Sequence, residues 1–328
     1  MNKKRVLSGI RASGRLHLGN YLGAVKGMLE LQEDPGYETL YMIADLHTMT
    51  TPYDAKSLKE NKREVVFDYL SAGLNPEKSV IFAQSDLADL HSLLAFYFST
   101  VTTVARMQHL PTYKDKIKQH PKNVTMALLN YPILMASDIL IYKASKVPVG
   151  IDQEPHLEVS REIARKMNEV YGTDFPEPSR FATKGEYIPS LVGEGKMSKT
   201  VEGSYINLTD TLAIIKKRLA AAPTDSGKGT KVPEVGGVAN LLKLVELFQG
   251  EGEREKFHKE YTSAGIKYSQ LKSELAEAIF KELKPIQKRR VELEKMPEYV
   301  DQVLEEGASR ARKIAEKTVD EVSVKMGL

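Results

Sequence analysis

Short runs of β-branched and aromatic residues alternate with helix-length segments through the first half of this 328-residue chain. The runs at 5–8, 39–44, 79–84 and 146–149 have the length and composition of buried strands. Between them apolar residues recur at helical spacing, as they do from Leu18 to Leu29. This alternation predicts a doubly wound, parallel α/β sheet with helices on both faces. Ligands of such sheets bind beyond the carboxyl ends of the strands, so functional residues are expected in the turns that follow them.

The second half of the chain has a different pattern. The segment 175–204 is rich in Pro, Gly, Ser and charged residues, and we expect it to be a mobile loop. Amphipathic helices are expected at 210–221, 238–249, 268–290 and 300–322. We therefore expect a Rossmann-like α/β domain at 1–204 and an all-helical domain at 205–328, whose last helix could pack back on the first domain.

Composition excludes several classes of protein. The chain has no cysteine, which rules out disulfides, cysteine-ligated zinc, iron–sulfur clusters and a cysteine nucleophile. Its net charge of +3 does not favour a grip on nucleic acid by the whole surface, but it leaves room for a local basic patch. The sequence shows neither a signal peptide nor the roughly 20 apolar residues of a spanning helix. We expect a cytoplasmic enzyme without membrane association.

A glycine-containing turn follows the first expected strand, and a helix begins near His17. The free N–H groups and positive dipole end of such a helix start suit phosphate. The spacing of Gly9, Gly14 and Gly19 does not match the dinucleotide-binding pattern G-x-G-x-x-G. What remains is His-Leu-Gly-Asn at 17–20, with an imidazole donor, a residue without a side chain on which a nucleotide can pack, and an amide. On its own, this segment is equally well explained by a histidine that only caps the helix start.

A second candidate segment, Gly-Lys-Met-Ser-Lys-Thr at 195–200, lies in the expected loop. Lys196 and Lys199 flank a small hydroxyl, and such a loop could close on the β- and γ-phosphates of a nucleotide. It would neutralise the charge that builds up as pyrophosphate leaves. Alone, a Lys-Ser stretch is more often a solvated loop, but the two segments together favour nucleotide chemistry.

The two segments together resemble the signatures of the class I aminoacyl-tRNA synthetases. Residues 17–20 are similar to the HIGH signature, with Asn20 in place of the second histidine. Residues 196–200 are similar to KMSKS, with Thr200 keeping the hydroxyl of the final serine. The resemblance extends over essentially the whole chain. It implies a catalytic first domain, a helical domain that binds the tRNA anticodon, and formation of an aminoacyl-adenylate from ATP before transfer to tRNA.

The segment 130–140 bears on the amino acid. Met135 and Asp138 are three residues apart, on one face of a helix, and with Tyr131 they would form an apolar pocket with one acceptor. One buried carboxylate matches the single N–H donor of indole. From the residues alone, a core helix with an Asp cap is favoured over this interpretation. The segment and 147–153 after it resemble the enzymes for tryptophan, and the tyrosine enzymes usually carry Gln where Met135 stands. The resemblance thus implies attachment of L-tryptophan to its tRNA, with tyrosyl-tRNA synthetase as the alternative.

The resemblance assigns three sets of residues. Those expected to act on the reacting phosphates are His17, Asn20, Lys116, Lys196 and Lys199. Those expected to contact ATP are Arg11, Ala12, Ser13, Gly19, Asn20, Gly150, Ile151, Asp152, Gln153, Ile188, Lys196, Met197, Ser198, Lys199 and Thr200. Those expected to contact tryptophan are Leu7, His47, Tyr131, Met135 and Asp138. Lys116 aligns only across a small insertion, so Lys114 stays open as its alternative, and His47 is as well explained as a structural histidine.

The resemblance also implies cofactors and partners. ATP is expected with Mg²⁺, and neither zinc nor the iron–sulfur cluster of some relatives is expected. Family members are homodimers with tRNA as a partner, and we expect the same here. A basic run in the helical domain suits tRNA phosphates, although most charge runs are simply solvated faces. This run consists of Lys281, Lys284, Lys288, Arg289 and Arg290.

Two other classes of function remain as alternatives. A small-molecule adenylyltransferase could share the HIGH-type site, but it would not need the long helical domain. A non-catalytic RNA-binding paralogue is possible in principle, and the presence of His17, Lys196 and Lys199 argues against it.

Overall fold

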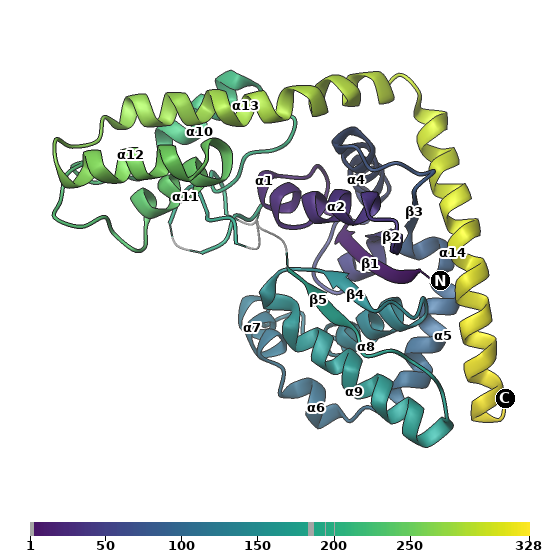
Figure 1. The fold of residues 1–328 in the computed structure, drawn as a ribbon. Helices are drawn as coiled ribbons and strands as arrows, with labels where there is room; N and C mark the ends of the chain where they lie inside the picture. The colour runs from purple at the N-terminus through teal and green to yellow at the C-terminus, as the bar shows by residue number, and fades with distance from the viewer. Residues whose placement is uncertain (1–2, 183–186, 194, 200) are drawn as a thin grey trace. The chain divides into compact units, whose positions relative to one another are not determined.

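A five-stranded parallel sheet forms the centre of the computed structural model, which describes residues 3–182, 187–193, 195–199 and 201–328. Its strands lie in the order β3-β2-β1-β4-β5 (Figure 1). From β1 the chain adds β2 and β3 on one side, and it then adds β4 and β5 on the other side of β1. The strands are β1 (Lys4–Arg11), β2 (Tyr37–Ala44), β3 (Ser79–Ala83), β4 (Lys146–Pro148) and β5 (Ser179–Phe181). This order belongs to a doubly wound sheet, so the predicted fold class is confirmed.

The chain packs as two compact units. Unit 1 consists of Met1–Gly14, Gly27–Thr183 and Met296–Leu328, and unit 2 consists of Arg15–Lys26 and Lys184–Lys295. These packing units are divided differently from the expected domains, because residues 15–26 belong to unit 2 and the last helix belongs to unit 1. The functional division after residue 204 stays a prediction.

Unit 1 contains the whole sheet. The last six residues of β2 and all of β3 are buried, which explains why these strands read as continuous apolar runs. Its long helices are α4 (Leu58–Ala72), α5 (Ala88–Ser99), α8 (Met126–Leu140), α9 (Glu154–Tyr171) and α14 (Pro297–Met326), and α2 (Lys26–Glu33) begins at its border. Its shorter helices are α3 (Asp45–Thr48), η2 (Gln84–Leu87), α6 (Val104–Gln108), α7 (Pro111–Gln119) and η3 (Ile151–Gln153). α8 packs against both α5 and α9.

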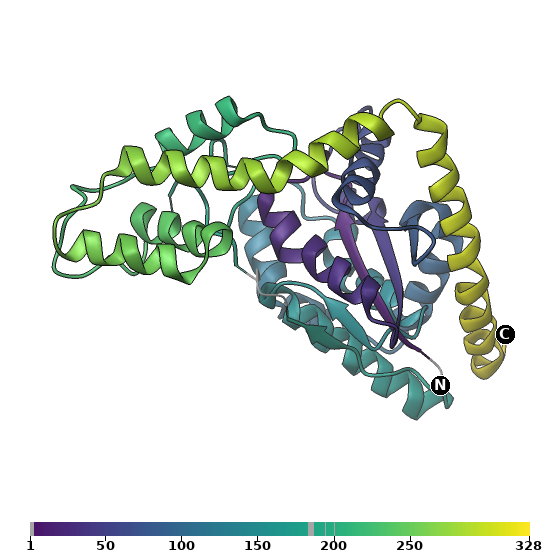
Figure 2. The ribbon, with the colours of Figure 1, turned by 45° about the horizontal axis from the view of Figure 1, so that its top comes forward.

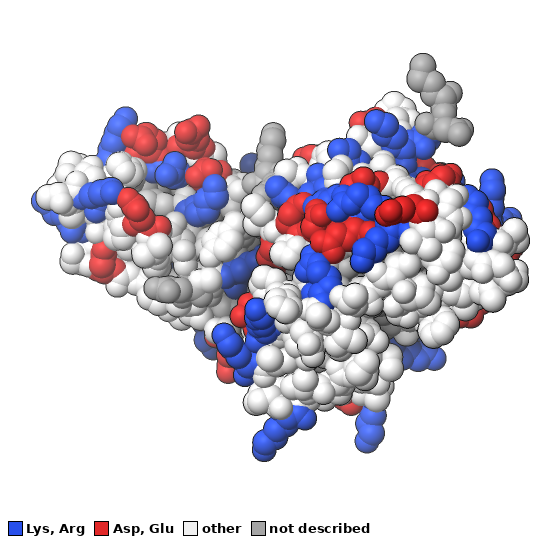
Figure 3. All heavy atoms as spheres, turned by 90° about the horizontal axis from the view of Figure 1, so that it is seen from below, with Lys and Arg blue, Asp and Glu red and all other residues white. Residues whose placement is uncertain are grey.

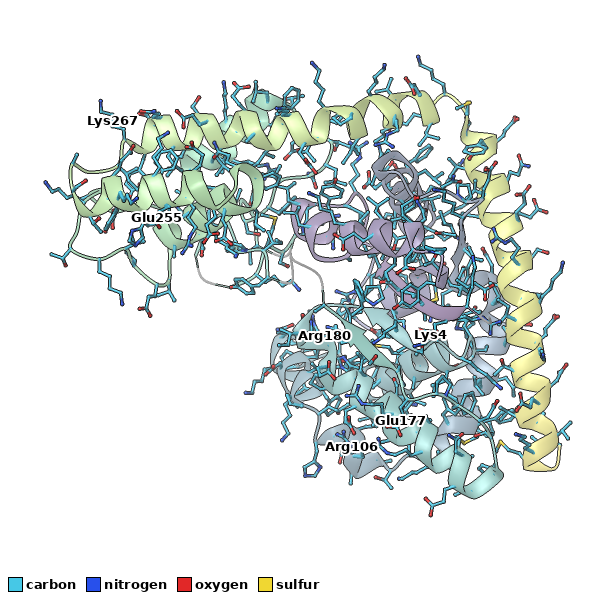
Figure 4. The ribbon with its side chains drawn as sticks, viewed as in Figure 1. Lys4, Arg106, Glu177, Arg180, Glu255 and Lys267 are labelled. Atoms are coloured by element: carbon cyan, nitrogen blue, oxygen red, sulfur yellow. The ribbon has the colours of Figure 1, made fainter. Side chains whose placement is uncertain are left out.

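The ends of these helices follow from local chemistry. α9 carries a proline in its first turn, where the missing N–H has no intrahelical partner to lose. α4 and α9 both end at a glycine in the left-handed conformation, Gly73 with φ 116° and Gly172 with φ 67°, which a residue with a side chain adopts only at a cost. Arg180 of β5 lies beside the start of α9 (Figure 4), with its Nε 3.5 Å from the carboxylate of Glu154.

The last helix, α14, runs along β3 and also contacts α4, α5 and α9 (Figure 2). Its Gly307 is buried against the strand, and a Cβ atom added there would lie 1.7 Å from the carbonyl oxygen of Ile81. Arg312 fixes the middle of the helix through a bidentate ion pair with Asp89, at 2.8 Å to each oxygen. The last helix thus packs on the sheet of unit 1.

Unit 2 is helical in the part that the structure describes. Its elements are α1 (Leu18–Asn20), η1 (Tyr21–Val25), α10 (Leu212–Ala221), α11 (Gly237–Gln249), α12 (Glu251–Thr262) and α13 (Tyr268–Leu293). α13 packs against α10 and α11, and α11 packs against α12. The side-chain amide of Gln287 on α13 donates to the carbonyl oxygens of Leu208 and Asp210 at 2.8 and 2.9 Å.

The elements that were not predicted include β5 and α12. β5 lies in the segment 175–204 that we expected to be a loop: it has only three residues, all half-buried, and it forms the edge of the sheet. α12 has too few buried side chains to show a helical stripe, because only Phe257 and Tyr261 reach the interior. Among the described helices, none is both long and apolar enough to cross a membrane.

Candidate active site

Asp138 is the central buried charge of unit 1. It lies in the last turns of α8, a helix that begins after Thr125, whose hydroxyl accepts the N–H of Leu128 at 3.2 Å. Asp138 is 2% exposed. A carboxylate at this depth is tolerated only when donors replace its lost hydration.

Three side chains supply those donors. Oδ1 of Asp138 accepts from Nε2 of Gln84 at 2.8 Å and from Nδ1 of His91 at 2.6 Å. Oδ2 accepts from Nε2 of His47 at 2.7 Å. Burial acts to raise the pKa of Asp138, but its interactions with His47 and then with His91 outweigh burial and lower the pKa to about 2. The carboxylate is therefore ionised at neutral pH, and the predicted residues His47 and Asp138 are in direct contact.

His47 and Gln84 both stand where the fold predicts functional groups. His47 lies in α3 directly after β2, and Gln84 opens η2 directly after β3. Because neighbouring parallel strands end at the same edge of a sheet, their following residues meet there. The backbone N–H of His47 also donates to Oε1 of Gln84 at 3.3 Å.

The other predicted tryptophan-contacting residues surround this region in unit 1. The ring of Tyr131 meets that of His47 edge to face, with centroids 6.4 Å apart. Met135 is half-buried against the apolar core to which Leu7 belongs. Leu7 itself is 3% exposed.

A second buried histidine, His156, joins Tyr131 to the residues at the start of α9. Its Nε2 is 2.7 Å from the hydroxyl of Tyr131, and its Nδ1 is 3.0 Å from Oε1 of Gln153. Gln153 in turn donates from Nε2 to Asp152 at 2.8 Å. Burial first, and then the charge of His47, lowers the pKa of His156 to about 4, so the ring is neutral at pH 7. The predicted ATP-contacting segment 150–153 is thus tied to the predicted tryptophan pocket.

Two cations of unit 1 act on each other: Arg11, the last residue of β1, and Lys116 of α7. Burial lowers the pKa of Lys116, and the positive charge of Arg11 lowers it further. Two cations held this way favour an anion between them. Lys114 is exposed. Of the other residues predicted here, Ala12 is buried and donates its N–H to the hydroxyl of Thr48 at 3.0 Å, whereas Ser13 is exposed.

In unit 2, His17 caps helix α1. The ring nitrogen Nδ1 of His17 accepts the backbone N–H of Gly19 at 3.0 Å. The backbone N–H of His17 donates to Oδ1 of Asn20 at 3.2 Å. An Nδ1 that accepts leaves the ring proton on Nε2, so that atom is a donor. A Cβ atom at Gly19 would lie 2.7 Å from Cε1 of His17, so a residue with a side chain there would displace the ring.

The lysine-containing loop lies beside this histidine. Burial first, then the charges of Lys199 and Lys196, lowers the pKa of His17 to about 4. Met197 anchors the loop: it is 3% exposed and donates its N–H to the carbonyl oxygen of Ile188 at 2.8 Å. The hydroxyl of Ser204 accepts the N–H of Ser198 at 3.4 Å.

The motif pair is therefore brought together within unit 2. The mobility of the loop stays a prediction, and Thr200 lies outside the described residues.

Several residues of these networks were not predicted. Gln84 could have been found, because it ends a predicted strand. His91 stands at the spacing of Leu87, Leu94 and Phe98 on the buried face of α5, and a lone polar residue on such a face is a detectable signal. No sequence pattern indicated His156.

The basic run of α13 is only partly available to a partner. Lys281, Lys284, Lys288 and Arg289 are exposed. Arg290 is 3% exposed, and its Nε donates to Glu294 at 2.8 Å. Because the side chain of Arg290 is buried, the expectation that it binds tRNA phosphates is withdrawn for this residue.

Comparison with known proteins identifies the family. Residues 1–284 match the sequence profile of the tRNA synthetases class I (W and Y). The chain is 38% identical to the tryptophan–tRNA ligase of Porphyromonas gingivalis over 97% of each chain, and 39% identical to that of Helicobacter pylori over the full length of both.

Solved structures agree. The crystal structure of tryptophanyl-tRNA synthetase from Mycoplasma pneumoniae matches with a TM-score of 0.86 and 31% identity, covering 100% of this chain and 98% of the other. That of the Campylobacter jejuni enzyme complexed with ADP and tryptophan matches with a TM-score of 0.83 and 33% identity, covering 99% and 100%. A tyrosyl-tRNA synthetase from Archaeoglobus fulgidus, at 20% identity and a TM-score of 0.69, shares the fold. The chain therefore belongs to the tryptophanyl-tRNA synthetases, within the class I tRNA synthetases for tryptophan and tyrosine.

Proposed function

We propose that this ligase joins L-tryptophan to its tRNA in two steps that its own residues support. In the first, a carboxylate oxygen of tryptophan bonds to the α-phosphorus of ATP, and the bond from that phosphorus to the bridging oxygen of the β-phosphate breaks and releases pyrophosphate. In the second, the 2′-hydroxyl of the terminal adenosine attacks the activated carbonyl, loses its proton, and AMP leaves. No side chain needs to be a nucleophile, so the protein contributes positioning and charge stabilisation.

The observation that carries the choice of amino acid is the ionised, buried Asp138. It accepts hydrogen bonds and cannot donate them, and indole offers one donor. A substrate without that donor leaves a buried carboxylate incompletely paired, which is the arrangement that gives strong discrimination. Tyr131, Met135 and Leu7 supply the apolar surroundings.

The groups of unit 2 suit a phosphate chain. The neutral ring of His17 offers an Nε2–H donor, and Asn20, whose oxygen is engaged by the backbone, offers its amide N–H groups. We assign these two to the α-phosphate, where charge develops in the first step. Lys196 and Lys199 supply the positive charge for departing pyrophosphate. Met197 and Ser198 hold the loop, and Ile188 contacts adenine through its backbone.

In unit 1, Arg11 and Lys116 supply positive charge for ATP. We favour Lys116 over Lys114 because Lys116 is half-buried and the charge of Arg11 acts on it, whereas Lys114 is exposed. Asp152 accepts from the ribose hydroxyls. In ATP sites Mg²⁺ usually arrives bound to the phosphates of the nucleotide, and several of its other ligands are water molecules. Among the described residues no three His, Asp or Glu side chains are grouped to hold a metal, so we assign Mg²⁺ no protein ligands and no step of the reaction.

Two partners complete the proposal. The exposed residues Lys281, Lys284, Lys288 and Arg289 form a basic row on α13 that suits tRNA phosphates. We also propose a homodimer that acts in the cytoplasm. Exposed apolar side chains lie on or next to α5, α6 and α8, and α8 packs against both α5 and α6 in unit 1. These are Leu93, Phe96, Val104, Val124 and Met126. The lower face of the molecule, seen in Figure 3, includes a broad area without charged side chains.

ATP–pyrophosphate exchange measured separately with tryptophan and tyrosine tests the proposal. We expect exchange with tryptophan, little with tyrosine, and a loss in kcat/KM for tryptophan on the order of 10²-fold in Asp138→Ala, as for removal of a single charged contact. Asp320→Ala, which removes an exposed carboxylate of α14, is the matched control and should behave as wild type. Equal exchange with both amino acids, or an unaffected Asp138→Ala, would contradict it.

A further inference from the structure

A buried pair behind Asp138, His91 and Tyr142, has no role in the reaction as described so far. Both side chains are fully buried. Nδ1 of His91 is 2.6 Å from Oδ1 of Asp138, and its Nε2 is 2.8 Å from the hydroxyl of Tyr142. The hydroxyl of Ser137 donates to the carbonyl oxygen of His91 at 2.8 Å, which fixes α5 to α8. A ring bound at both nitrogens keeps one orientation.

The direction of each hydrogen bond follows from the two residues on either side of His91, which are Asp138 and Tyr142. The ionised Asp138 can only accept, so Nδ1 of His91 carries a proton and donates. Burial first, and then the charge of Asp138, raises the pKa of Tyr142 well above its ordinary value. Its hydroxyl therefore keeps its proton and donates to Nε2 of His91. With Nδ1 donating to Asp138 and Nε2 accepting from Tyr142, the ring of His91 satisfies both partners.

Counting acceptor positions shows what the pair does to the carboxylate. Oδ1 of Asp138 has two lone pairs, and His91 and Gln84 occupy both. Oδ2 accepts from His47, which leaves it one lone pair among the contacts of the described residues. The two oxygens of Asp138 are therefore not equivalent.

We propose that the His91–Tyr142 pair is a positioning device for tryptophan selection: together with Gln84 it fills Oδ1 of Asp138, so that only Oδ2, beside His47, can accept the indole N–H. This inference rests on the proposed role of Asp138. His91 is a positioning residue, since it acts through the carboxylate. The pair thus favours a substrate with a single N–H donor that can reach Oδ2 of Asp138.

Arg11 of β1 acts on Tyr131 at the rim of this network, and the other ionisable groups that face it come from several helices. They are His47 of α3, His91 of α5, Tyr131 of α8, His156 of α9, and Arg312 of α14, whose charge acts on Tyr142. Loss of the His91 donor removes one of the interactions that keep the pKa of Asp138 low. The pKa of Asp138 then rises, and the carboxylate is protonated at a higher pH than in the wild type.

The test compares tryptophan with the analogue in which sulfur replaces the indole N–H, 3-(benzothiophen-3-yl)alanine. For His91→Leu we expect kcat/KM in ATP–pyrophosphate exchange to fall about 10- to 100-fold for tryptophan, as for a lost hydrogen bond to a charge, and to stay nearly unchanged for the analogue. His91→Asn, whose amide N–H can replace Nδ1–H, should recover most of the loss. Tyr142→Phe should show a smaller loss that is again confined to tryptophan.

The pH profile is the second measurement. KM for tryptophan in His91→Leu should rise as the pH falls from 7 to 5.5, whereas the wild-type value stays level. Equal losses for tryptophan and the analogue, or no loss for either, would overturn the proposal, because a purely structural role affects both substrates alike. If His91→Leu does not fold, judged by circular dichroism, Tyr142→Phe decides. Absence of tryptophan-dependent exchange in the wild type would instead refute the proposed function.

Discussion

At the scale of single residues, burial decides the charge of the site histidines. His17 and His156 both have a pKa of about 4, and in both cases burial is the largest cause. The rings are therefore neutral at pH 7 and act as donor and acceptor in fixed directions. Because the folded pKa lies below the ordinary 6.5, the unfolded chain binds more protons between pH 6.5 and 4, so each ring lowers stability as the pH falls through that window.

The first prediction concerns the charge that acts on His17. Lys199→Met removes one of two lysine charges that lower its pKa, so the pKa of His17 should rise, though not to 6.5, because burial remains. An NMR titration of the imidazole protons measures this. Exchange with tryptophan should fall on the order of 10²-fold or more. Lys217→Met, an exposed lysine on α10, serves as the control for both readouts, and an unchanged His17 titration in Lys199→Met would contradict the loop contact.

Several residue assignments could be made before the structure because they follow simple rules. His17 lies in the turn region after the first strand, where open parallel sheets place their ligands. His47 was assigned by the family resemblance, and Gln84, which ends a predicted strand, was missed. The partners of Asp138 could not be assigned fully, because His91 and Tyr142 approach it from α5 and from the turn after α8, which only tertiary packing brings together. The burial of Arg290 could not be predicted either, since a basic run shows charge but not which face of a helix is covered.

At the scale of elements, the sequence indicates well those segments whose burial has a clear period. β2 and β3 are buried along most of their length, and α9 and α14 each bury a regular stripe. β5 is too short to show a period, and its three residues are ordered by pairing with β4 rather than by their own apolar pattern.

The contact of α14 with β3 gives the second prediction. Gly307→Ala places a Cβ 1.7 Å from the carbonyl oxygen of Ile81, so helix and strand must separate, and we expect a loss in unfolding free energy of about 3 kcal/mol. Gly252→Ala is the matched control: it lies in α12 with nothing within 4 Å, and alanine there should stabilise the helix by up to about 1 kcal/mol. Urea unfolding followed by circular dichroism measures both, and a Gly307→Ala protein as stable as wild type would refute the close contact.

At the scale of the whole molecule, the exposed apolar residues of unit 1 concern assembly. Phe96 is 66% exposed and Met126 is 65% exposed, and burying such side chains against a second copy is favourable at roughly 25 cal/mol per Å². A dimer contact through α5, α6 and α8 would cover them.

The third prediction follows from this surface. Phe96→Asp should shift the protein from dimer to monomer at micromolar concentration, because a charge would be buried without a partner. Sedimentation velocity measures the change. Val324→Asp, which alters an equally exposed apolar residue on α14, should remain dimeric. A wild-type protein that sediments as a monomer would refute the proposed dimer.

The return of α14 to the sheet also determines when the protein can become complete during its synthesis. Unit 1 combines residues that precede and follow the segment Lys184–Lys295 of unit 2, so β3 is synthesised more than two hundred residues before the α14 that packs on it. Until α14 emerges, β3 lacks the contacts that this helix makes with it in the folded protein. A ribosome that stalls late in this message therefore leaves a chain in which the residues of unit 2 are complete and those of unit 1 are not.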